Sequence, residues 1–397
     1  MDLPKERPQR DILEIFKQEK SQEHGFLRVS APMVRYSKLE FRRLLRKHGV
    51  KLCFTPMIIA DSFNNSEKAR QNEFTTTPDD EPIIAQFAAK DSTEFVNSAL
   101  LIYPYVDGID LNCGCPQSWA ISKGYGCGLL KQPEVVKDII QTIRRRINNN
   151  FSVSLKIRLL NHESSKTTID FARQLEMCGA TFLTLHGRTM WQKTSDPLNV
   201  AAIRDIKQSL RIPLIANGNV KSWQSACELY EQTQADGIMA ARGLLANPTL
   251  FNPKFKDIDE IPPLDCIQDW FNIAAEAGDN LQFLCFHHHL TFMWGGNLKR
   301  KLRLEFNSYT KKQQIFDFFH DNYNIKPSVQ FSLNPLKYNR CTYSHYTPII
   351  DQYKSAEVST DNWNSNTNGK FFNEFNQELV QDIDEDCELG SSFFADM

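Results

Sequence analysis

The chain has 397 residues, of which 41% are hydrophobic and 24% charged, and its formal net charge is −2 at pH 7. These values are ordinary for a globular protein with one large domain and a smaller module, and no apolar run approaches the roughly 18 residues of a membrane-spanning helix. The charged residues 1–20 do not resemble a secretory signal, and ten irregularly spaced cysteines then indicate reduced thiols. We therefore expect a cytoplasmic location, with the nucleus as an alternative, and no membrane partner.

Short apolar runs recur along residues 27–241, and helix-length amphipathic stretches separate the later ones. The runs span residues 27–33, 51–57, 82–88, 108–112, 152–158, 181–187, 212–217 and 236–241. Eight strand–helix units in about 230 residues predict an α/β fold, a (β/α)8 TIM barrel over residues 27–258, with residues 1–26 as an N-terminal extension. A doubly wound sheet is the alternative, but it would need a glycine-rich fingerprint after its first strand, and none is present.

Beyond residue 258 the pattern changes to helices without intervening strands. The stretches 262–278, 280–296 and 299–323 predict a small all-helical domain over residues 259–326. Residues 327–397 hold four Lys or Arg and eleven Asp or Glu, a net charge of −7, which leaves +5 for the rest of the chain. We expect this acidic, low-complexity tail to be disordered.

Polar side chains gather at the carboxyl ends of the predicted strands, where a TIM barrel carries its chemistry. Period-two alternation sets Lys156 and Arg158 on the face opposite to Val153 and Leu155, so that Lys156 points to the barrel mouth. A single strand-end lysine or histidine is more often a surface or structural residue, and only their convergence on one rim favours a site. The strand ends supply Pro32, Met33, Val34, Gln86, Asn112, Lys156, Arg158, His186, Arg188, Asn217, Gly218, Asn219, Ala241 and Arg242.

The seventh and eighth strand ends suggest a phosphate site. The turn at residues 217–219 offers backbone N–H groups, and Arg242 opens the helix after the eighth strand. Loops at these two positions form the usual phosphate site of TIM barrels. A phosphate-bearing cofactor such as FMN fits, with Lys156 placed to stabilise the negative charge of the reduced flavin.

Seven motifs, in order along the chain, resemble those of the tRNA-dihydrouridine synthase family, and the loop after residue 112 looks most like the eukaryotic dihydrouridine synthase 4 (4-like) branch. The resemblance covers about residues 27–325. It implies FMN-dependent reduction of a uridine of the tRNA D-loop to dihydrouridine, with NAD(P)H as reductant, and by resemblance to the branch we expect positions 20a and 20b. The motifs are APMVRYS, QFAA, DLNCGCPQ, LKIR, LHGRT, ANGNV and ARGLLANP.

The resemblance also assigns residues. By its position in the motif, Cys115 matches the family's proton donor. A thiol suits this role, because it is largely protonated at neutral pH and can protonate C5 of uracil. Cys113 lies nearer the strand, and we expect it to be packed. A metal pair would need further ligands, and since only Cys127 is near we expect no metal. Asn219 departs from the family, many members of which have Asp there. The implied FMN contacts are Pro32, Met33, Val34, Gln86, Asn112, Lys156, His186, Asn217, Gly218, Asn219, Ala241 and Arg242.

The expected partner is tRNA, bound by a monomer whose target base is turned out into the barrel mouth. A basic run on a helix is commonly a solvated face, but beside such a site phosphate contact is favoured. The histidine run 287–289 is interpreted as packing or RNA contact. Two alternatives remain: an FMN-dependent oxidoreductase of a free pyrimidine or other small molecule, and a tRNA-binding protein that has lost catalysis. The candidate RNA contacts are Arg158, Arg188, Lys299, Arg300, Lys301 and Arg303.

Overall fold

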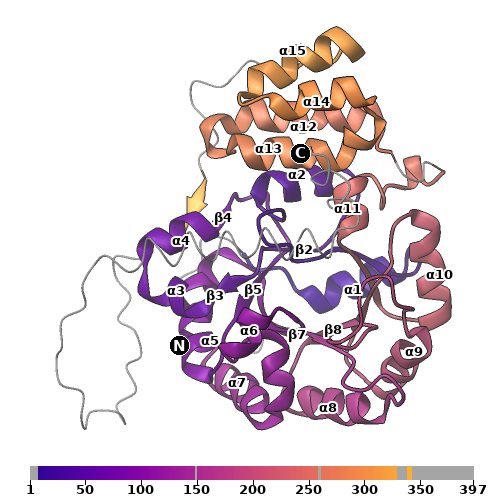
Figure 1. Cartoon of the computed structure of the whole chain (residues 1–397). Coiled ribbons are helices and arrows are strands. Elements are labelled where there is room, and N and C mark those ends of the chain that lie inside the picture. The colour runs from indigo at the N-terminus through magenta and orange to yellow at the C-terminus, as the bar shows by residue number, and fades with distance from the viewer. Residues whose placement is uncertain (1–7, 148–149, 258–260, 329–337, 342–397) are drawn as a thin grey trace.

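A closed barrel of eight parallel strands forms the body of the protein (Figure 1). The structure is a computed structural model and describes residues 8–147, 150–257, 261–328 and 338–341. Within them the strands run in the order β1-β10-β9-β8-β7-β6-β5-β2, and a bridge between Val29 and Leu52 closes the ring. All eight coincide with apolar runs of the sequence, so the predicted TIM barrel is confirmed. The strands are β1 (Leu27–Ser30), β2 (Cys53–Phe54), β5 (Ile83–Ala88), β6 (Gly108–Cys113), β7 (Ser152–Arg158), β8 (Phe182–His186), β9 (Leu214–Asn217) and β10 (Gly237–Ala240).

Alternate residues of each strand face opposite sides of the barrel wall. Val153 and Leu155 pack into the main core under the surrounding helices, as the period-two alternation predicts. A second apolar cluster lies on the opposite strand faces, inside the barrel, and α1 (Ile12–Lys20) closes it from the amino-terminal end. The ring of Phe16 there meets Phe182 edge-on at 5.5 Å. The interior is therefore apolar at this end, and polar side chains gather at the other.

Helices follow the strands and cover the outside of the barrel (Figure 1). The covering helices are α2 (Leu39–Lys47), α5 (Ser92–Ile102), α7 (Pro133–Arg146), α8 (Lys166–Met177), α9 (Val200–Ser209), α10 (Trp223–Thr233) and the short α11 (Arg242–Ala246). Two loops carry additional elements. After β2 come β3 (Ile58–Ile59), α3 (Ala60–Asn65), α4 (Glu67–Glu73) and β4 (Thr75–Thr76), and after β6 come α6 (Ser118–Ser122) and the 3-10 helix η2 (Gly126–Lys131).

Four further helices pack as a group against one side of the barrel, next to α2 and α11 (Figure 1). The ring of His289 stacks on Phe41 of α2 with centroids 4.1 Å apart, and the buried Trp270 meets both rings. The helical part and the barrel therefore share a core. The four helices are α12 (Leu264–Ala277), α13 (Phe283–Trp294), α14 (Arg300–Ser308) and α15 (Lys312–Tyr323).

The stretch 299–323, which was predicted to be helical, forms two helices in the structure. The chain leaves α14 at Ser308, where residues of low helix propensity follow one another. The side-chain oxygen of Gln314 then accepts hydrogen bonds from the backbone amides of Thr310 and Lys311, which starts α15 in a new direction.

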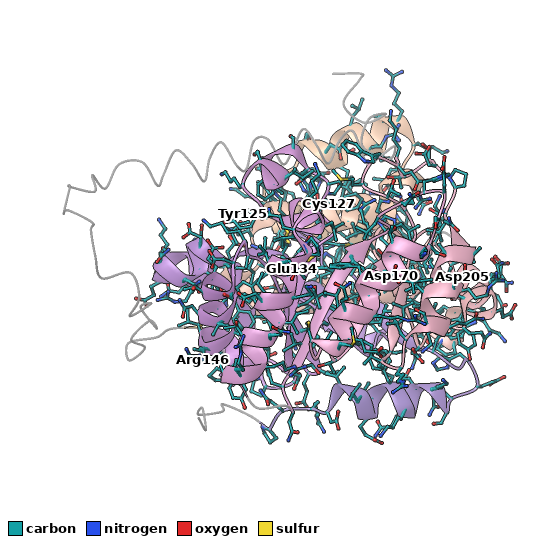
Figure 2. The ribbon with its side chains drawn as sticks, turned by 90° about the horizontal axis from the view of Figure 1, so that it is seen from below. Tyr125, Cys127, Glu134, Arg146, Asp170 and Asp205 are labelled. Carbon is teal, nitrogen blue, oxygen red and sulfur yellow. The ribbon has the colours of Figure 1, made fainter. Side chains whose placement is uncertain are left out.

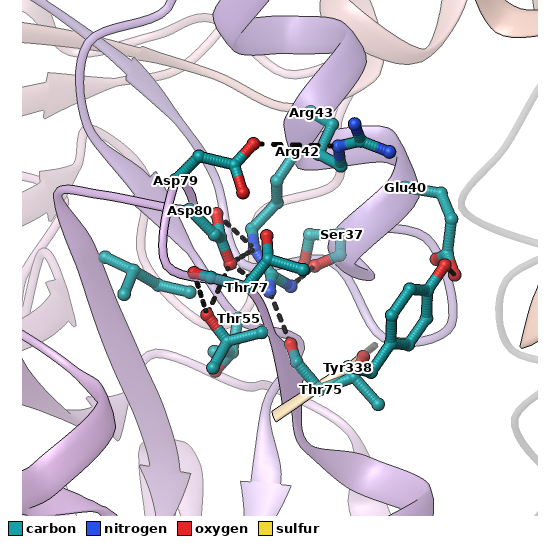
Figure 3. A network of polar contacts seen from close by, with 12 residues as sticks. Ser37, Glu40, Arg42, Arg43, Thr55, Thr75, Thr77, Asp79, Asp80 and Tyr338 are labelled. Carbon is teal, nitrogen blue, oxygen red and sulfur yellow. Dashed lines mark hydrogen bonds and ion pairs between the residues drawn. The ribbon is translucent and has the colours of Figure 1, made fainter. Parts of the chain in front are cut away.

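A buried ion cluster ties α2 to the segment before β5 (Figure 3). The carboxylate of Asp80 is fully buried and bonds to Arg42 at 2.6 Å and to Arg46 at 3.0 Å. Arg42 also donates to the carbonyl of Thr75 in β4 at 2.8 Å. One carboxylate thus holds together a helix, a short strand and the entry to a barrel strand.

Part of the predicted tail is attached to this region. The strand β11 (Asn339–Arg340) pairs antiparallel with β4, and the hydroxyl of Tyr338 donates to Glu40 of α2 at 2.9 Å. The four residues 338–341 therefore differ from the disorder expected of the tail, because they gain backbone and side-chain partners on the barrel. Residues 329–337 and 342–397 lie outside the described residues. In the described part of the chain, no helix has the length and apolar character needed to cross a membrane.

Candidate active site at the carboxyl ends of the strands

The carboxyl ends of β6 to β9 bring the predicted polar residues into neighbouring register positions. Asn112 pairs with Lys156, and Lys156 pairs with Thr184. His186 pairs with Asn217 at the end of β9. Because paired residues of parallel strands point to the same side of the sheet, these side chains share the inner rim of the barrel.

The side chain of Asn112 holds the loop that follows β6. Its Oδ1 accepts hydrogen bonds from the backbone amides of Gly114 at 3.0 Å and Cys115 at 2.9 Å. The carbonyl of Cys115 accepts in turn from the amide of Cys127 at 2.9 Å. Gly126, with φ of +57°, is required beside it, since a Cβ there would lie 2.6 Å from the Cys115 carbonyl oxygen. The loop is fixed from both sides.

Three cysteines around this loop differ in exposure. Cys113 is completely buried in the outer core, and burial raises the pKa of its thiol well above the usual range. Cys127, labelled with Tyr125 in Figure 2, is also buried, and burial raises its pKa to about 11. Cys115 is only half-buried, and its Sγ lies 3.8 Å from Oε1 of Gln117. Of these three thiols, Cys115 alone can meet a substrate.

Buried polar side chains of β5, β6 and β7 form a bonded series beneath the loop. Nδ2 of Asn112 donates to Oε1 of Gln86 at 2.9 Å, and Nε2 of Gln86 donates to Oδ2 of Asp110 at 2.8 Å. The hydroxyl of Ser154 donates to Oδ1 of Asp110 at 2.6 Å. Burial raises the pKa of Asp110 to about 6, although these hydrogen bonds lower it. Asp110 was not predicted as a site residue, yet it stands two positions before Asn112 and so on the same strand face.

Lys156 and His186 lie half-buried at the rim and have strongly shifted pKa values. Burial, followed by the charge of Arg158, lowers the pKa of Lys156 to about 8. Burial also lowers the pKa of His186 well below its usual range, so the imidazole is neutral at pH 7. The rim concentrates positive charge, which suits an anionic ligand. The cations that add to the His186 shift are Arg158, Lys156, Arg188 and Arg242.

Two arginines predicted to contact RNA bond to backbone carbonyls of the site. Arg158 donates from Nε to Gly114 at 2.8 Å and from Nη1 to Thr189 at 3.0 Å, and thereby braces the thiol loop. Arg188 is 1% exposed and donates from Nε and Nη2 to the carbonyl of Asp196 at 2.8 and 2.6 Å. A guanidinium buried in this way does not reach a phosphate at the surface. The structure thus gives Arg188 a supporting position in place of the predicted RNA contact.

The turn after β9 has an unusual backbone. Gly218 has φ of +141°, and a Cβ there would lie 2.3 Å from Cδ1 of Leu198. Asn219 adopts the left-handed conformation with φ of +56°, which Asn tolerates better than most residues. Its Oδ1 accepts from Nη2 of Arg188 at 2.9 Å. An Asp at this position could accept the same bond, so Asn219 preserves the acceptor that the family's common residue would offer.

The predicted phosphate loops lie against each other. Asn217 donates from Nδ2 to the backbone of β10 at 3.0 Å. Ala241 follows β10, and the exposed Arg242 is the first residue of α11. At Gly243 a Cβ would lie 2.3 Å from the carbonyl oxygen of Val220, so the turn after β9 touches the start of α11. The two strand ends form one continuous surface.

Pro32, Met33 and Val34 form a half-buried turn after β1. The amide of Met33 donates to Oγ of Ser37 at 2.9 Å. Val34 belongs to a small apolar cluster with Cys115, so the structure brings the first predicted strand end to the thiol. The remaining members of the cluster were not predicted as site residues and are Met57, Ile59, Ala88, Trp119, Ala120 and Tyr125.

An unpaired hydroxyl beside Lys156 also fits a bound group. Oγ1 of Thr184 is buried and has no hydrogen-bond partner among the residues that the structure describes. A buried hydroxyl without a partner is costly, as is a half-buried ammonium such as that of Lys156. A polar ligand at the rim would compensate both.

The remaining predicted RNA contacts lie away from the strand ends, on the helical part. Lys299, Arg300 and Lys301 are exposed at the start of α14 and form no ion pair within the described ranges. Arg303 is half-buried on the same helix. Their contact with RNA stays a prediction.

The histidine run 287–289 has a packing function in two of its three members. The ring nitrogens of His287 and His289 lie 3.1 and 3.2 Å from the carbonyls of Phe306 and Tyr36, and both rings are buried. Among the described side chains, no group of three or more His, Cys, Asp or Glu residues is arranged to hold a metal ion.

The fold and the rim define a class of protein, a TIM barrel whose rim combines the partly exposed thiol of Cys115 with cations that suit an anionic ligand. A sequence model described as dihydrouridine synthase (Dus) matches residues 29–315. Since this match spans most of the chain, the protein belongs to the dihydrouridine synthase family.

Several relatives agree with this assignment. A Mus musculus protein named tRNA-dihydrouridine(20a/20b) synthase, NAD(P)+-like, is 45% identical over 298 residues, which are 75% of this chain and 89% of that protein. The tRNA-dihydrouridine(20a/20b) synthase (NAD(P)+) of Saccharomyces cerevisiae is 31% identical over 80% of this chain and 85% of its own length. Among solved structures, an old yellow enzyme homologue from Zymomonas mobilis superposes on 59% of this chain and 89% of that chain with 12% identity and a TM-score of 0.44, a likeness too distant to bear on function.

Proposed function

We propose that this protein is a tRNA-dihydrouridine synthase that reduces the C5=C6 bond of a uridine in tRNA with electrons from NAD(P)H. The relatives from Mus musculus and Saccharomyces cerevisiae carry this activity and NAD(P)+ in their names. The observation that carries the proposal in this chain is the state of Cys115. It is a partly exposed thiol on a loop fixed by Asn112, two residues from a thiol that is completely buried.

Cys115 supplies the proton that the reaction needs. Saturating the C5=C6 bond requires a hydride at C6 and a proton at C5, and a thiol is mostly protonated at neutral pH. The loop bonds of Cys115 to Asn112 and Cys127 use its backbone N–H and C=O, so they fix the position of the residue without occupying Sγ in those bonds.

FMN is the flavin that the rim suits. Reduced FMN, when bound, supplies the hydride. Arg242 and the turn at residues 217–219 would hold its phosphate, as expected of the loops after the last two barrel strands. Lys156 would stabilise negative charge on the flavin, and the neutral His186 would serve as a hydrogen-bond partner. Pro32, Met33, Val34, Gln86 and Asn112 complete the proposed contacts.

The substrate is an RNA and not a free base. A uridine in a folded tRNA must leave its stack to reach a thiol at a barrel rim. The exposed cations Lys299, Arg300 and Lys301 at the start of α14 offer contacts for the phosphates of the same molecule. Positions 20a and 20b are the proposed targets, since the relatives from Mus musculus and Saccharomyces cerevisiae are named for them.

The test is dihydrouridine formation by the purified protein. Protein reconstituted with FMN and supplied with NADPH is incubated with an unmodified tRNA transcript, and dihydrouridine is mapped by site-specific chemical cleavage. We expect modification at 20a and 20b, and none at these positions in tRNA from cells lacking the protein. Reduction of free uracil with no modification of tRNA would favour the small-molecule oxidoreductase. Binding of tRNA without any dihydrouridine would favour a protein that has lost catalysis.

A further inference from the structure

A continuous series of hydrogen bonds connects a buried carboxylate to the backbone of the thiol loop. It begins at Asp110 in β6, passes through Gln86 in β5 and returns to Asn112 in β6. From Asn112 it reaches the backbone amides of Gly114 and Cys115. Each bond measures between 2.8 and 3.0 Å.

The carboxylate sets the direction of this series. An ionised Asp110 can only accept hydrogen bonds, so Gln86 must turn its Nε2 toward it and its Oε1 away. Oε1 of Gln86 then selects Nδ2 of Asn112, which leaves Oδ1 of Asn112 facing the loop. Only this orientation lets Asn112 accept from two backbone N–H groups. With either amide reversed, two donors or two acceptors would face each other.

The series is shielded from water along most of its length. Asp110 is fully buried, Gln86 is 1% exposed and Asn112 is 8% exposed. The second oxygen of Asp110 is occupied by the hydroxyl of Ser154 at 2.6 Å, so both oxygens accept a bond. With so little water to compensate a misplaced amide, each group depends on the orientation of the one before it.

Packing alone gives no reason for a carboxylate here. Apolar residues of similar volume in place of buried charges are often neutral or stabilising. Other inward residues of the barrel, such as Phe182 and Ile215, are apolar. A buried carboxylate is costly at a core position, and here it accepts from Ser154 and Gln86 and lies within electrostatic reach of Lys156. Of these contacts, the one to Gln86 leads to the thiol loop.

We propose that Asp110 is a positioning residue, which through Gln86 and Asn112 sets the conformation of the loop that presents Cys115. The inference rests on the proposed function in one respect, namely that Cys115 is the proton donor. Arg158 donates to the carbonyl of Gly114 at 2.8 Å, whereas the series from Asp110 ends on the backbone amide of Gly114. Both polar backbone groups of Gly114 are therefore bonded.

A pair of variants tests the direction of the series. Gln86→Met keeps the approximate volume of the side chain but removes both of its hydrogen bonds, which breaks the series. The double variant Gln86→Glu/Asp110→Asn retains it, because the carboxylate introduced at position 86 accepts both from the side-chain amide introduced at position 110 and from Nδ2 of Asn112. The double variant also keeps one negative charge near Lys156. Asp110→Leu is the third variant, since it removes the acceptor without leaving a buried charge.

The first readout is the rate at which iodoacetamide alkylates Cys115 in the FMN-free protein, with Cys113 in the same molecule as an internal control for global opening. In Gln86→Met and Asp110→Leu we expect Cys115 to react roughly fivefold faster, the change in a local opening equilibrium caused by losing one buried hydrogen bond, with Cys113 unchanged. In the double variant the rate should return to that of the wild type. This readout needs neither flavin nor tRNA, so it remains informative even if the proposed function fails.

The second readout is steady-state kinetics with tRNA. With FMN saturating, we expect kcat to fall by roughly tenfold to a hundredfold in Gln86→Met and Asp110→Leu. The KM for tRNA should be nearly unchanged, because a displaced donor affects proton transfer and not RNA binding. The double variant should recover most of kcat. Two results would overturn the proposal. The first is a folded Asp110→Leu with the alkylation rate and kcat of the wild type. The second is a folded double variant that is no better than Gln86→Met in either readout.

Discussion

Cys113 and Cys115 stand two residues apart in the chain and occupy opposite environments. Cys113 is the last residue of β6, and its side chain is completely buried among the apolar residues beneath the helices. Cys115 lies in the following loop, half-buried, within the small cluster that includes Val34. The difference arises because β6 ends at Cys113 and the loop held by Asn112 turns the chain toward the rim.

We therefore expect Cys115→Ala and Cys113→Ala to behave differently. Cys115→Ala should lower dihydrouridine formation by roughly 10²–10⁴, the usual contribution of a positioned proton donor, and leave flavin binding and flavin reduction by NAD(P)H intact. Cys113→Ala should retain activity and lose some stability from packing. Single-turnover assays with tRNA and stopped-flow flavin reduction measure the two steps. An inactive Cys113→Ala beside a near-normal Cys115→Ala would show that the other thiol is the donor.

Lys156 makes the stability of the FMN-free protein depend on pH in alkaline solution. Burial lowers its pKa to about 8 from an unfolded value near 10.4. Between these two values the unfolded chain binds more protons than the folded one, so the cost of the buried charge is relieved as pH rises. Relative to Lys156→Met, whose residue 156 does not titrate, the wild type should gain on the order of 2 kcal/mol in its free energy of unfolding between pH 7.5 and pH 10. Urea unfolding at both pH values measures it, and a difference independent of pH would contradict the shift.

Arg242→Ala should weaken the retention of FMN. The exposed guanidinium at the start of α11 would lose its charge-assisted bond to the phosphate, so we expect the Kd for FMN to rise by roughly tenfold or more. Arg211→Ala is the matched control, since this exposed arginine lies before β9 at the opposite end of the barrel. Fluorescence titration of the FMN-free protein measures both affinities. Equal affinities in the two variants would remove Arg242 from the phosphate site.

The start of α14 should contribute to tRNA binding. Arg300→Ala/Lys301→Ala removes two exposed cations, and we expect a higher KM for tRNA and a salt dependence of binding shallower by about two units of slope. Arg145→Ala/Arg146→Ala, at the exposed end of α7, is the control of equal charge. NAD(P)H oxidation by oxygen should be the same in both. If the two double variants bind tRNA alike, the start of α14 is a solvated face.

Asp80 should be important for stability and not for chemistry. Asp80→Ala leaves Arg42, which is 1% exposed, without its ion-pair partner, and such a loss costs about 3–5 kcal/mol. Burial raises the pKa of Asp80, but the charges of Arg42 and Arg46 outweigh it and the net pKa is lowered. The stabilisation is therefore complete above the ordinary pKa of Asp and is lost as pH falls through the lowered value. Thermal unfolding at pH 7 and pH 3 should show a gap between wild type and variant that narrows in acid, and an equal gap at both would count against this ion cluster.

The sequence by itself determined the barrel, because each strand must bury one face under helices and the alternation of apolar residues records which face that is. It also located the rim residues, since the carboxyl ends of parallel strands meet at one edge. The sequence did not predict Asp110 as a site residue, because a single carboxylate in an apolar run does not reveal its partners. Gln86 and Ser154, which make it a functional candidate, come from other strands and meet it only in the closed barrel.

Only the tertiary structure decided which cations can meet a ligand. Arg188 and Arg242 look alike in the sequence, each close to a strand end, yet one is 1% exposed and bonded to the Asp196 carbonyl and the other is exposed at the start of a helix. The difference depends on the path of the loop at residues 188–196, which brings the carbonyl of Asp196 to the guanidinium of Arg188. Such a loop has no periodicity, so its path is set by contacts between residues distant in sequence, such as the bond from Arg188 to Asn219.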